Sequence, residues 1–149
     1  MSRSSTSFFQ LTGLFSVGFL GVLAGCGSDS NGDIDKGKDE VMEHACQSCH
    51  GTNMAGVATS PAPGSTAAYA PNLTPDAETG IAEWSTDQIV AAILTGVDDE
   101  GASLCAVMPR FGSVTPPMSS DEAKAIAAYL KSLPPVKNMV MESMCAERK

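Results

Sequence analysis

Aromatic residues are scarce in this chain of 149 residues, which holds five Phe, two Tyr and one Trp. Four of the five phenylalanines precede residue 26, so the rest of the chain has only Tyr69, Trp84, Phe111 and Tyr129. The length fits one domain. Large aromatic side chains often supply much of the apolar area that a core buries. A domain so poor in them has to find apolar bulk in aliphatic side chains or in a bound cofactor.

Basic residues are also few, because 9 Lys and Arg stand against 17 Asp and Glu, for a formal net charge of −8. Such a surface disfavours nucleic acid and anionic membrane surfaces as partners. Two interpretations stay open. The acidic surface docks on a basic face of a partner protein, or it serves solubility only.

The chain also lacks an uninterrupted apolar run of the length that a transmembrane helix needs. Its most apolar stretch, residues 1–25, is broken by Gln10, Thr12 and Ser16. That stretch combines one basic residue, Arg3, with an apolar centre and small residues at its end, which is the layout of a secretory signal. We therefore expect residues 1–25 to be a signal peptide and the protein to be exported.

The apolar stretch closes with LAGC, residues 23–26, which resembles the lipobox of bacterial lipoproteins. The resemblance implies that Cys26 is lipidated and anchors the mature protein to a membrane on the periplasmic side. The alternative is an ordinary signal peptide with an incidental cysteine. Gly27 stands where an aspartate is linked to inner-membrane retention in lipoproteins, so the outer membrane is the expected address.

A short polar, Gly/Ser-rich stretch follows, and its composition predicts a flexible tether over residues 26–33. The predicted domain then spans residues 34–149, with a C-terminal extension from about residue 136.

The strongest functional signal is HACQSCHG, residues 44–51. Cys46, Cys49 and His50 form C-x-x-C-H, the attachment signature of c-type haem. Two thiols bond to the haem vinyl groups, and the adjacent histidine is the proximal iron ligand. Chance is a poor explanation, because the chain has only five cysteines and two histidines. The motif predicts one covalently bound haem c.

Two other uses of paired cysteines compete with haem. A structural zinc site would need a second Cys or His pair at close spacing, whereas Cys105 and Cys145 are far apart in the sequence. A thioredoxin-like redox pair would need a βαβ context, which the surrounding sequence does not offer.

Four blocks together resemble the class I cytochromes c over roughly residues 34–136. They are closest to the cytochrome domains found with bacterial alcohol and sugar-acid dehydrogenases. The resemblance implies an all-α cytochrome c fold, with three to five helices around the haem. Those dehydrogenase subunits often carry several haem motifs, whereas this chain has one. The blocks are GDIDKGKDEVMEHACQSCHG, PNLTPDAETGIAEWSTDQIVAAILTG, MPRFG and MSSDEAKAIAAYLKSLPPV.

A second axial ligand would close the haem iron and favour electron transfer. His44 lies six residues before His50 on the same short segment, which excludes bis-histidine ligation within one chain. The ligand is therefore expected to be a methionine. Met108, followed by Pro109, matches the Met-Pro ligand of the family. Met118 is the alternative, although its place before a helix cap suits a hydrophobic staple.

The resemblance also implies two supporting residues. Pro71 matches the family position whose carbonyl accepts a hydrogen bond from the proximal histidine, here His50, which would fix its tautomer. Trp84 matches a tryptophan that donates to a haem propionate, with a plain buried Trp as the alternative.

Two helices have clear boundaries in the sequence. Ser85 and Gln88 have capping-box spacing, and Gly96 suits the C-terminal stop. Ser119 and Glu122 repeat the capping box for the last helix.

The last helix is expected to end before Pro134. The family packs it across the first helix, with Gly37 allowing close approach to Tyr129. Residues 52–70, rich in Ala, Gly, Pro, Ser and Thr, are predicted to be loop, and the sequence suggests no strands.

Two cysteines remain after lipid takes Cys26 and haem takes Cys46 and Cys49. In an oxidising compartment, spare cysteines usually pair. We therefore expect a Cys105–Cys145 disulfide, with two free thiols as the alternative.

Together these features predict an electron-transfer cytochrome with no catalytic residues, carrying one electron between redox protein partners. Two alternatives remain. One is a haem enzyme or gas sensor with a displaceable sixth ligand, and the other is a subunit of a periplasmic dehydrogenase complex.

Overall fold

The computed structural model describes residues 30–63, 65 and 68–145. The predicted signal peptide, Cys26 and the first part of the tether lie outside these residues. Regular structure in the described part is helical, without strands, which confirms the all-α prediction. None of the described helices is long and apolar enough to cross a membrane. The elements are α1 (Ser30–Glu43), α2 (Gln47–His50), α3 (Thr86–Thr95), the 3-10 helix η1 (Phe111–Ser113) and α4 (Ser120–Ser132).

Helix α1 begins earlier than the sequence suggests. It starts at Ser30 rather than near residue 34, so residues 30–33 of the predicted tether are helical. Asp33 lies in the first turn, where a negative charge stabilises the positive end of the helix dipole. The tether was predicted from Gly/Ser composition, which takes no account of this interaction between Asp33 and the helix dipole.

Both predicted capping boxes are present. The Ser85 side chain accepts from Gln88 N at the start of α3, and the Gln88 side chain accepts from Ser85 N. Ser119 and Glu122 make the same reciprocal pair at α4. Helix α3 ends at Thr95, and its C-cap Gly96 has the left-handed φ, 72°, that a C-terminal glycine cap requires.

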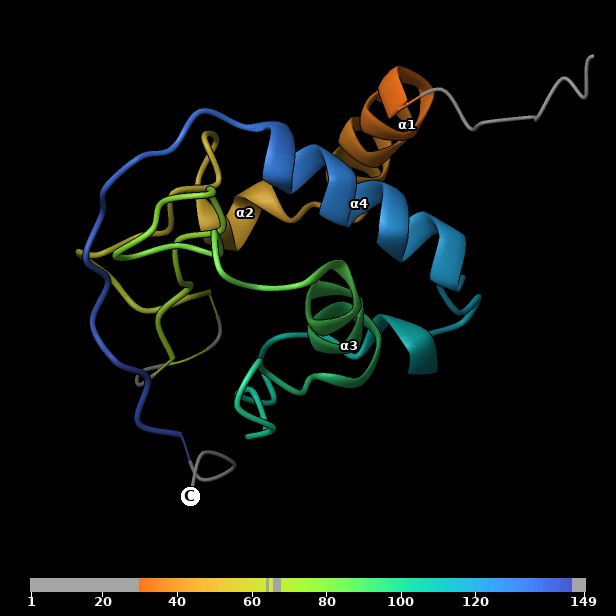
Figure 1. The fold of residues 1–149 in the computed structure, drawn as a ribbon. Coiled ribbons are helices and arrows are strands. Elements are labelled where there is room, and N and C mark those ends of the chain that lie inside the picture. The colour runs from red at the N-terminus through yellow and green to blue at the C-terminus, as the bar shows by residue number, and fades with distance from the viewer. Residues whose placement is uncertain (1–29, 64, 66–67, 146–149) are drawn as a thin grey trace, which may run out of the picture.

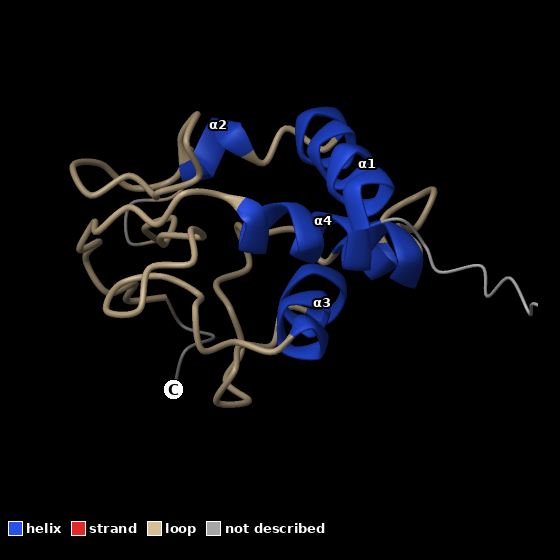
Figure 2. Cartoon of the chain, turned by 45° about the horizontal axis from the view of Figure 1, so that its top comes forward, coloured by secondary structure: helices blue, strands red, loops and turns tan. Residues whose placement is uncertain are grey.

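Helices α1 and α4 cross at close range, and α3 packs against α4 (Figures 1 and 2). Gly37 lies at the crossing, where an added Cβ would stand 1.9 Å from the Ala125 carbonyl oxygen and 2.9 Å from Tyr129 Cβ. Only glycine allows this separation. The buried core between the helices is mostly aliphatic, with members that include Val41, Ile126 and Leu130, and it also contains Phe111.

Loops form the other half of the molecule, beside the three longer helices (Figure 2). After α4 the chain leaves the helices and runs along the outside of these loops (Figure 1). We call this segment, residues 133–145, the tail. Its hydrogen bonds to the loops include those between Asn72 and Val136, Asn138 and Ala55, and Tyr69 and Ser143.

Candidate functional site

The C-x-x-C-H motif forms a single helical turn. His50 N donates to Cys46 O at 3.0 Å, and α2 covers Gln47–His50. Residues three and four apart in a helix share one face, so Cys46, Cys49 and His50 lie together. Cys46 and Cys49 are half-buried free thiols. Burial raises the pKa of the Cys46 thiol, and the nearby Cys49 adds to that rise.

The ring of His50 is held in one orientation. It is buried, and its Nδ1 lies 2.9 Å from the carbonyl oxygen of Pro71. A carbonyl oxygen can only accept, so Nδ1 carries the proton and Nε2 keeps its lone pair. Burial lowers the pKa of His50, which favours this neutral form, although the bond to Pro71 opposes the shift.

Main-chain bonds bring Pro71 to the histidine. Gly56 N donates to His50 O at 2.9 Å, which folds the chain back after the motif. Leu73 N then donates to Met54 O at 2.8 Å, so the segment around Pro71 runs beside this return. The Pro71 carbonyl is thereby fixed opposite the ring of His50.

Two adjoining cavities lie between the motif and the loops. The larger, of about 470 Å³, is lined by Cys49, His50, Trp84 and Met108 together with loop and tail residues. The smaller, of about 150 Å³, is lined by Cys46, Cys49, His50 and Met108 with core side chains. The larger volume is in the range of cofactor sites, about 300–1,000 Å³. Cys49, His50 and Met108 line both cavities.

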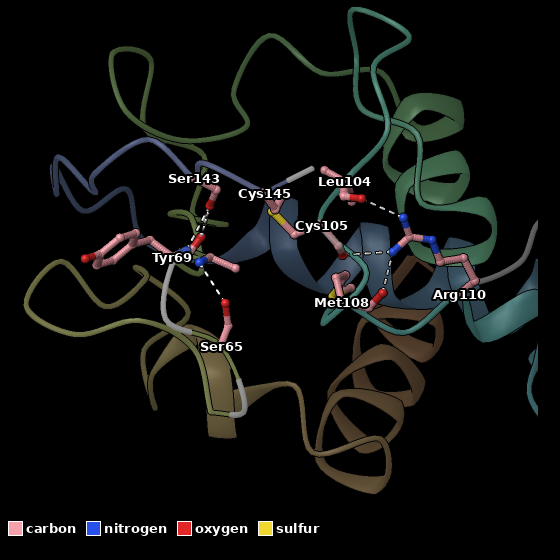
Figure 3. The surroundings of a disulfide bond; sticks show 9 residues. Ser65, Tyr69, Leu104, Cys105, Met108, Arg110, Ser143 and Cys145 are labelled. Atoms are coloured by element: carbon pink, nitrogen blue, oxygen red, sulfur yellow. Dashed lines mark hydrogen bonds between the residues drawn. A yellow bond between two sulfur atoms is a disulfide. The ribbon is translucent and has the colours of Figure 1, made fainter. Parts of the chain in front are cut away.

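Met108 comes from the segment between α3 and η1, on which two constraints converge (Figure 3). The structure joins Cys105 to Cys145 in a disulfide, with their Cα atoms 5.6 Å apart. The bond ties the Met108 segment to the end of the tail. Arg110 donates to main-chain carbonyls of the same segment, including that of Leu104 at 2.6 Å.

Met118 and His44, the other side chains considered as iron ligands, and Trp84, the expected propionate donor, have different surroundings. Met118 is buried, lines only the smaller cavity, and donates its main-chain N–H to Phe111 O at 2.9 Å. His44 packs edge-to-face on Phe111, with ring centroids 5.1 Å apart, and its Nε2 lies 3.5 Å from Glu40. Trp84 lines the larger cavity and is partly buried.

Sequence reasoning missed Asn72, which is 2% exposed. Its Nδ2 donates to Val136 O at 2.7 Å and to Thr79 Oγ1 at 2.9 Å, and its Oδ1 accepts from Thr74 N at 2.9 Å. One side chain thus joins the segment that carries Pro71 to the tail. An asparagine directly after the proline was the available signal.

The described residues contain no group of three or more His, Cys, Asp or Glu side chains that could hold a metal ion. Cys105 is bonded to Cys145 in a disulfide. This bond argues against the zinc interpretation, because Cys105 and Cys145 then do not supply the second pair of ligands that a structural zinc site needs.

Residues 32–130 match the family described as cytochrome c oxidase, cbb3-type, subunit III. The chain belongs to this family of c-type cytochrome domains. A nicotinate dehydrogenase subunit of Pseudomonas putida is 30% identical over 156 positions, covering 91% of this chain and 13% of the relative. The cytochrome c subunit of alcohol dehydrogenase (quinone) of Gluconobacter oxydans is 36% identical over 67 positions, covering 45% of this chain and 14% of the relative.

The chain therefore spans only about a seventh of the length of these relatives. The family match confirms the predicted resemblance to class I c-type cytochromes, and electron transfer is the function of such a domain.

The family implies haem c, and the residues of this chain fit it. The motif turn supplies two free thiols. His50 has an unprotonated Nε2, and Met108 supplies a thioether on the same cavity. The cavity lining is mostly apolar, which suits a macrocycle and excludes water from it.

Proposed function

We propose that this chain carries one haem c, bonded through Cys46 and Cys49, with His50 and Met108 as axial ligands, and shuttles single electrons between redox proteins. The observation that carries the proposal is that one cavity is lined by Cys49, His50 and Met108. The bound haem supplies the one-electron chemistry, at a potential that Met/His ligation raises. The protein binds the group, fixes the tautomer of His50 and excludes water.

Met108 is favoured over Met118 by its surroundings. Met108 lines both cavities, while Met118 is a core residue of the smaller one. Pro71 supports the role of His50 through the 2.9 Å hydrogen bond. Trp84, on the larger cavity, is proposed to donate its indole N–H to a haem propionate.

Covalent attachment is tested by intact mass and visible absorption of protein exported from a host that attaches haem c. Wild type is expected to carry the mass of one haem per chain and an intense haem spectrum. The Cys46→Ser/Cys49→Ser variant is expected to lose both, whereas Cys105→Ser/Cys145→Ser keeps them. A colourless wild type with the mass of the bare polypeptide would contradict the proposal.

We propose further that the protein is exported and anchored through a lipid on Cys26, on the periplasmic side of the outer membrane. The LAGC segment supports this address. Detergent phase partitioning tests it. Wild type is expected in the detergent phase and Cys26→Ser in the aqueous phase, and equal partitioning would contradict the anchor.

A dehydrogenase is the partner that we propose as electron donor. Support comes from the names of the two relatives, a nicotinate dehydrogenase subunit and the cytochrome c subunit of an alcohol dehydrogenase. Co-purification from the native membrane, followed by mass spectrometry, tests it. Recovery of a dehydrogenase in fixed ratio is expected, and recovery of the cytochrome alone would contradict a stable complex.

A further inference from the structure

The segment that carries Met108 has little regular structure of its own. Between α3 and η1 there is no helix or strand. Near the methionine, Leu104 N donates to Gly96 O at 2.8 Å and Met108 N donates to Cys105 O at 3.0 Å. The second bond closes a tight turn, residues 105–108, and the first ties the residue before that turn to the C-cap of α3. The carbonyl oxygens of this segment, each with two lone pairs, can accept further bonds from a side chain.

A single side chain occupies three of those carbonyls. The guanidinium of Arg110 donates through Nη2 to Leu104 O at 2.6 Å and through Nη1 to Cys105 O at 3.0 Å. Nη1 also donates to the carbonyl of Met108 itself. Figure 3 shows the group reaching across the turn from one side. Both ends of the turn are therefore fixed to one planar cation.

The same side chain also packs against the end of α3. An added Cβ at Gly96 would lie 2.3 Å from Arg110 Nε, so the arginine packs directly on the glycine that caps the helix. The last turn of α3 has no basic residue of its own. Arg110 brings a positive charge to this carbonyl end, where the helix dipole favours a cation.

We propose that Arg110 is the positioning residue for Met108: by joining the methionine turn to α3, it holds the thioether on the cavity. The inference rests on the proposed function, in which Met108 is the sixth iron ligand. An arginine suits the task because its rigid fork presents several donors at once, while lysine is a flexible point charge. Loss of the fork leaves Met108 easier to displace.

Imidazole titration of the oxidised holoprotein measures that displacement. Arg110→Gln is expected to bind imidazole about tenfold or more tightly than wild type, since several charge-assisted hydrogen bonds are lost. The long-wavelength absorption band of Met–iron ligation is expected to weaken in the same variant. Arg110→Lys is expected to bind imidazole with an affinity between those of wild type and Arg110→Gln. It also serves as the test variant if the glutamine variant does not fold.

Two control variants separate positioning from charge and from global stability. Lys137→Gln removes one positive charge from the tail, where Lys137 pairs with Glu78. Ala123→Gly weakens α4 at a fully buried position that lines neither cavity. Both are expected to bind imidazole as wild type does, within about twofold.

The inference is overturned if Arg110→Gln and Arg110→Lys bind imidazole as weakly as wild type, or if either control variant shifts the affinity equally. A failure of the proposed function is distinguishable from both results. In that case wild type itself would lack haem or the Met–iron band.

Discussion

The helical half and the loop half of this protein are held together by different means. Helices α1, α3 and α4 pack through a mostly aliphatic core, and α3 and α4 begin at side-chain caps. The loop half, which supplies Pro71 and Met108 to the cavity, depends on single hydrogen bonds between loops, many of them from side chains to the main chain, and on one disulfide. The positions of the axial ligands therefore depend on a few specific contacts, while the fold depends on distributed packing.

The tail connects the two halves. It begins where α4 ends and is bonded to the loops near Asn72, near Ala55 and at Cys105. Damage to the helical half is therefore expected to lower stability without altering ligation in the protein that stays folded. Damage to the loop half is expected to alter ligation as well.

The largest loss of stability is expected from Gly37→Ala. The new Cβ would overlap the main-chain carbonyl of Ala125, which cannot rotate away, so α1 has to separate from α4. We expect a loss of about 3 kcal/mol in denaturant unfolding. Lys38→Ala, an exposed neighbour, is the control and should change stability by less than about 0.5 kcal/mol. Equal values for the two variants would contradict the close crossing.

Removal of the disulfide is expected to have the next largest effect. The 40-residue separation of Cys105 and Cys145 predicts a loss of about 2–4 kcal/mol for the double serine variant. Unlike Gly37→Ala, this variant is also expected to weaken the Met–iron band. Wild type treated with a reductant should behave in the same way. An unchanged unfolding midpoint after verified reduction would show that the bond does not stabilise the tail.

Asn72→Ala tests the histidine side of the loop half. The change removes the acceptor of the buried Thr74 N–H and one of two donors to Val136 O, and should cost about 2–3 kcal/mol. A shift in the haem spectrum is expected as well, because the Pro71 carbonyl, next to Asn72, is then held less firmly against the ring of His50. Asn53→Ala, at an exposed asparagine that accepts one bond from Ala55 N, is the control. Equal effects would contradict a special role for Asn72.

The smallest expected effect is a pH dependence of stability that comes from Glu122, at the start of α4 in the helical half. The bond from Ser119 N holds the pKa of Glu122 below its ordinary 4.5. Folding therefore favours the ionised form, and this contribution is complete above the ordinary pKa and lost as pH falls through the lowered pKa. Urea unfolding across the acid range, from about pH 6 to about pH 3, should show the difference between wild type and Glu122→Gln shrinking toward the acid end. A constant difference would contradict the capping role of the charge.

The helical half was largely predictable from the sequence, because caps and glycines act locally. Ser85, Ser119, Gly96 and Gly37 all take the positions that their spacing or the family resemblance suggested. The start of α1 was not predictable from composition, because a polar Gly/Ser stretch is typical of a tether.

The loop half was predictable only in part. The C-x-x-C-H motif was recognised from its spacing, whereas Pro71 and Met108 were found because the family resemblance supplied them. Asn72 and Arg110 were missed, since their partners lie on distant segments or on main-chain carbonyls that leave no pattern in the sequence. Contacts of that kind become visible only when the fold is known.

The central claim, that His50 and Met108 would be the two protein ligands of one haem iron, is tested most directly by redox titration with absorption spectra of wild type and Met108→Ala. The account predicts that Met108→Ala loses the Met–iron band and titrates at a lower potential, while Met118→Leu matches wild type. An unchanged spectrum and potential in Met108→Ala would contradict it.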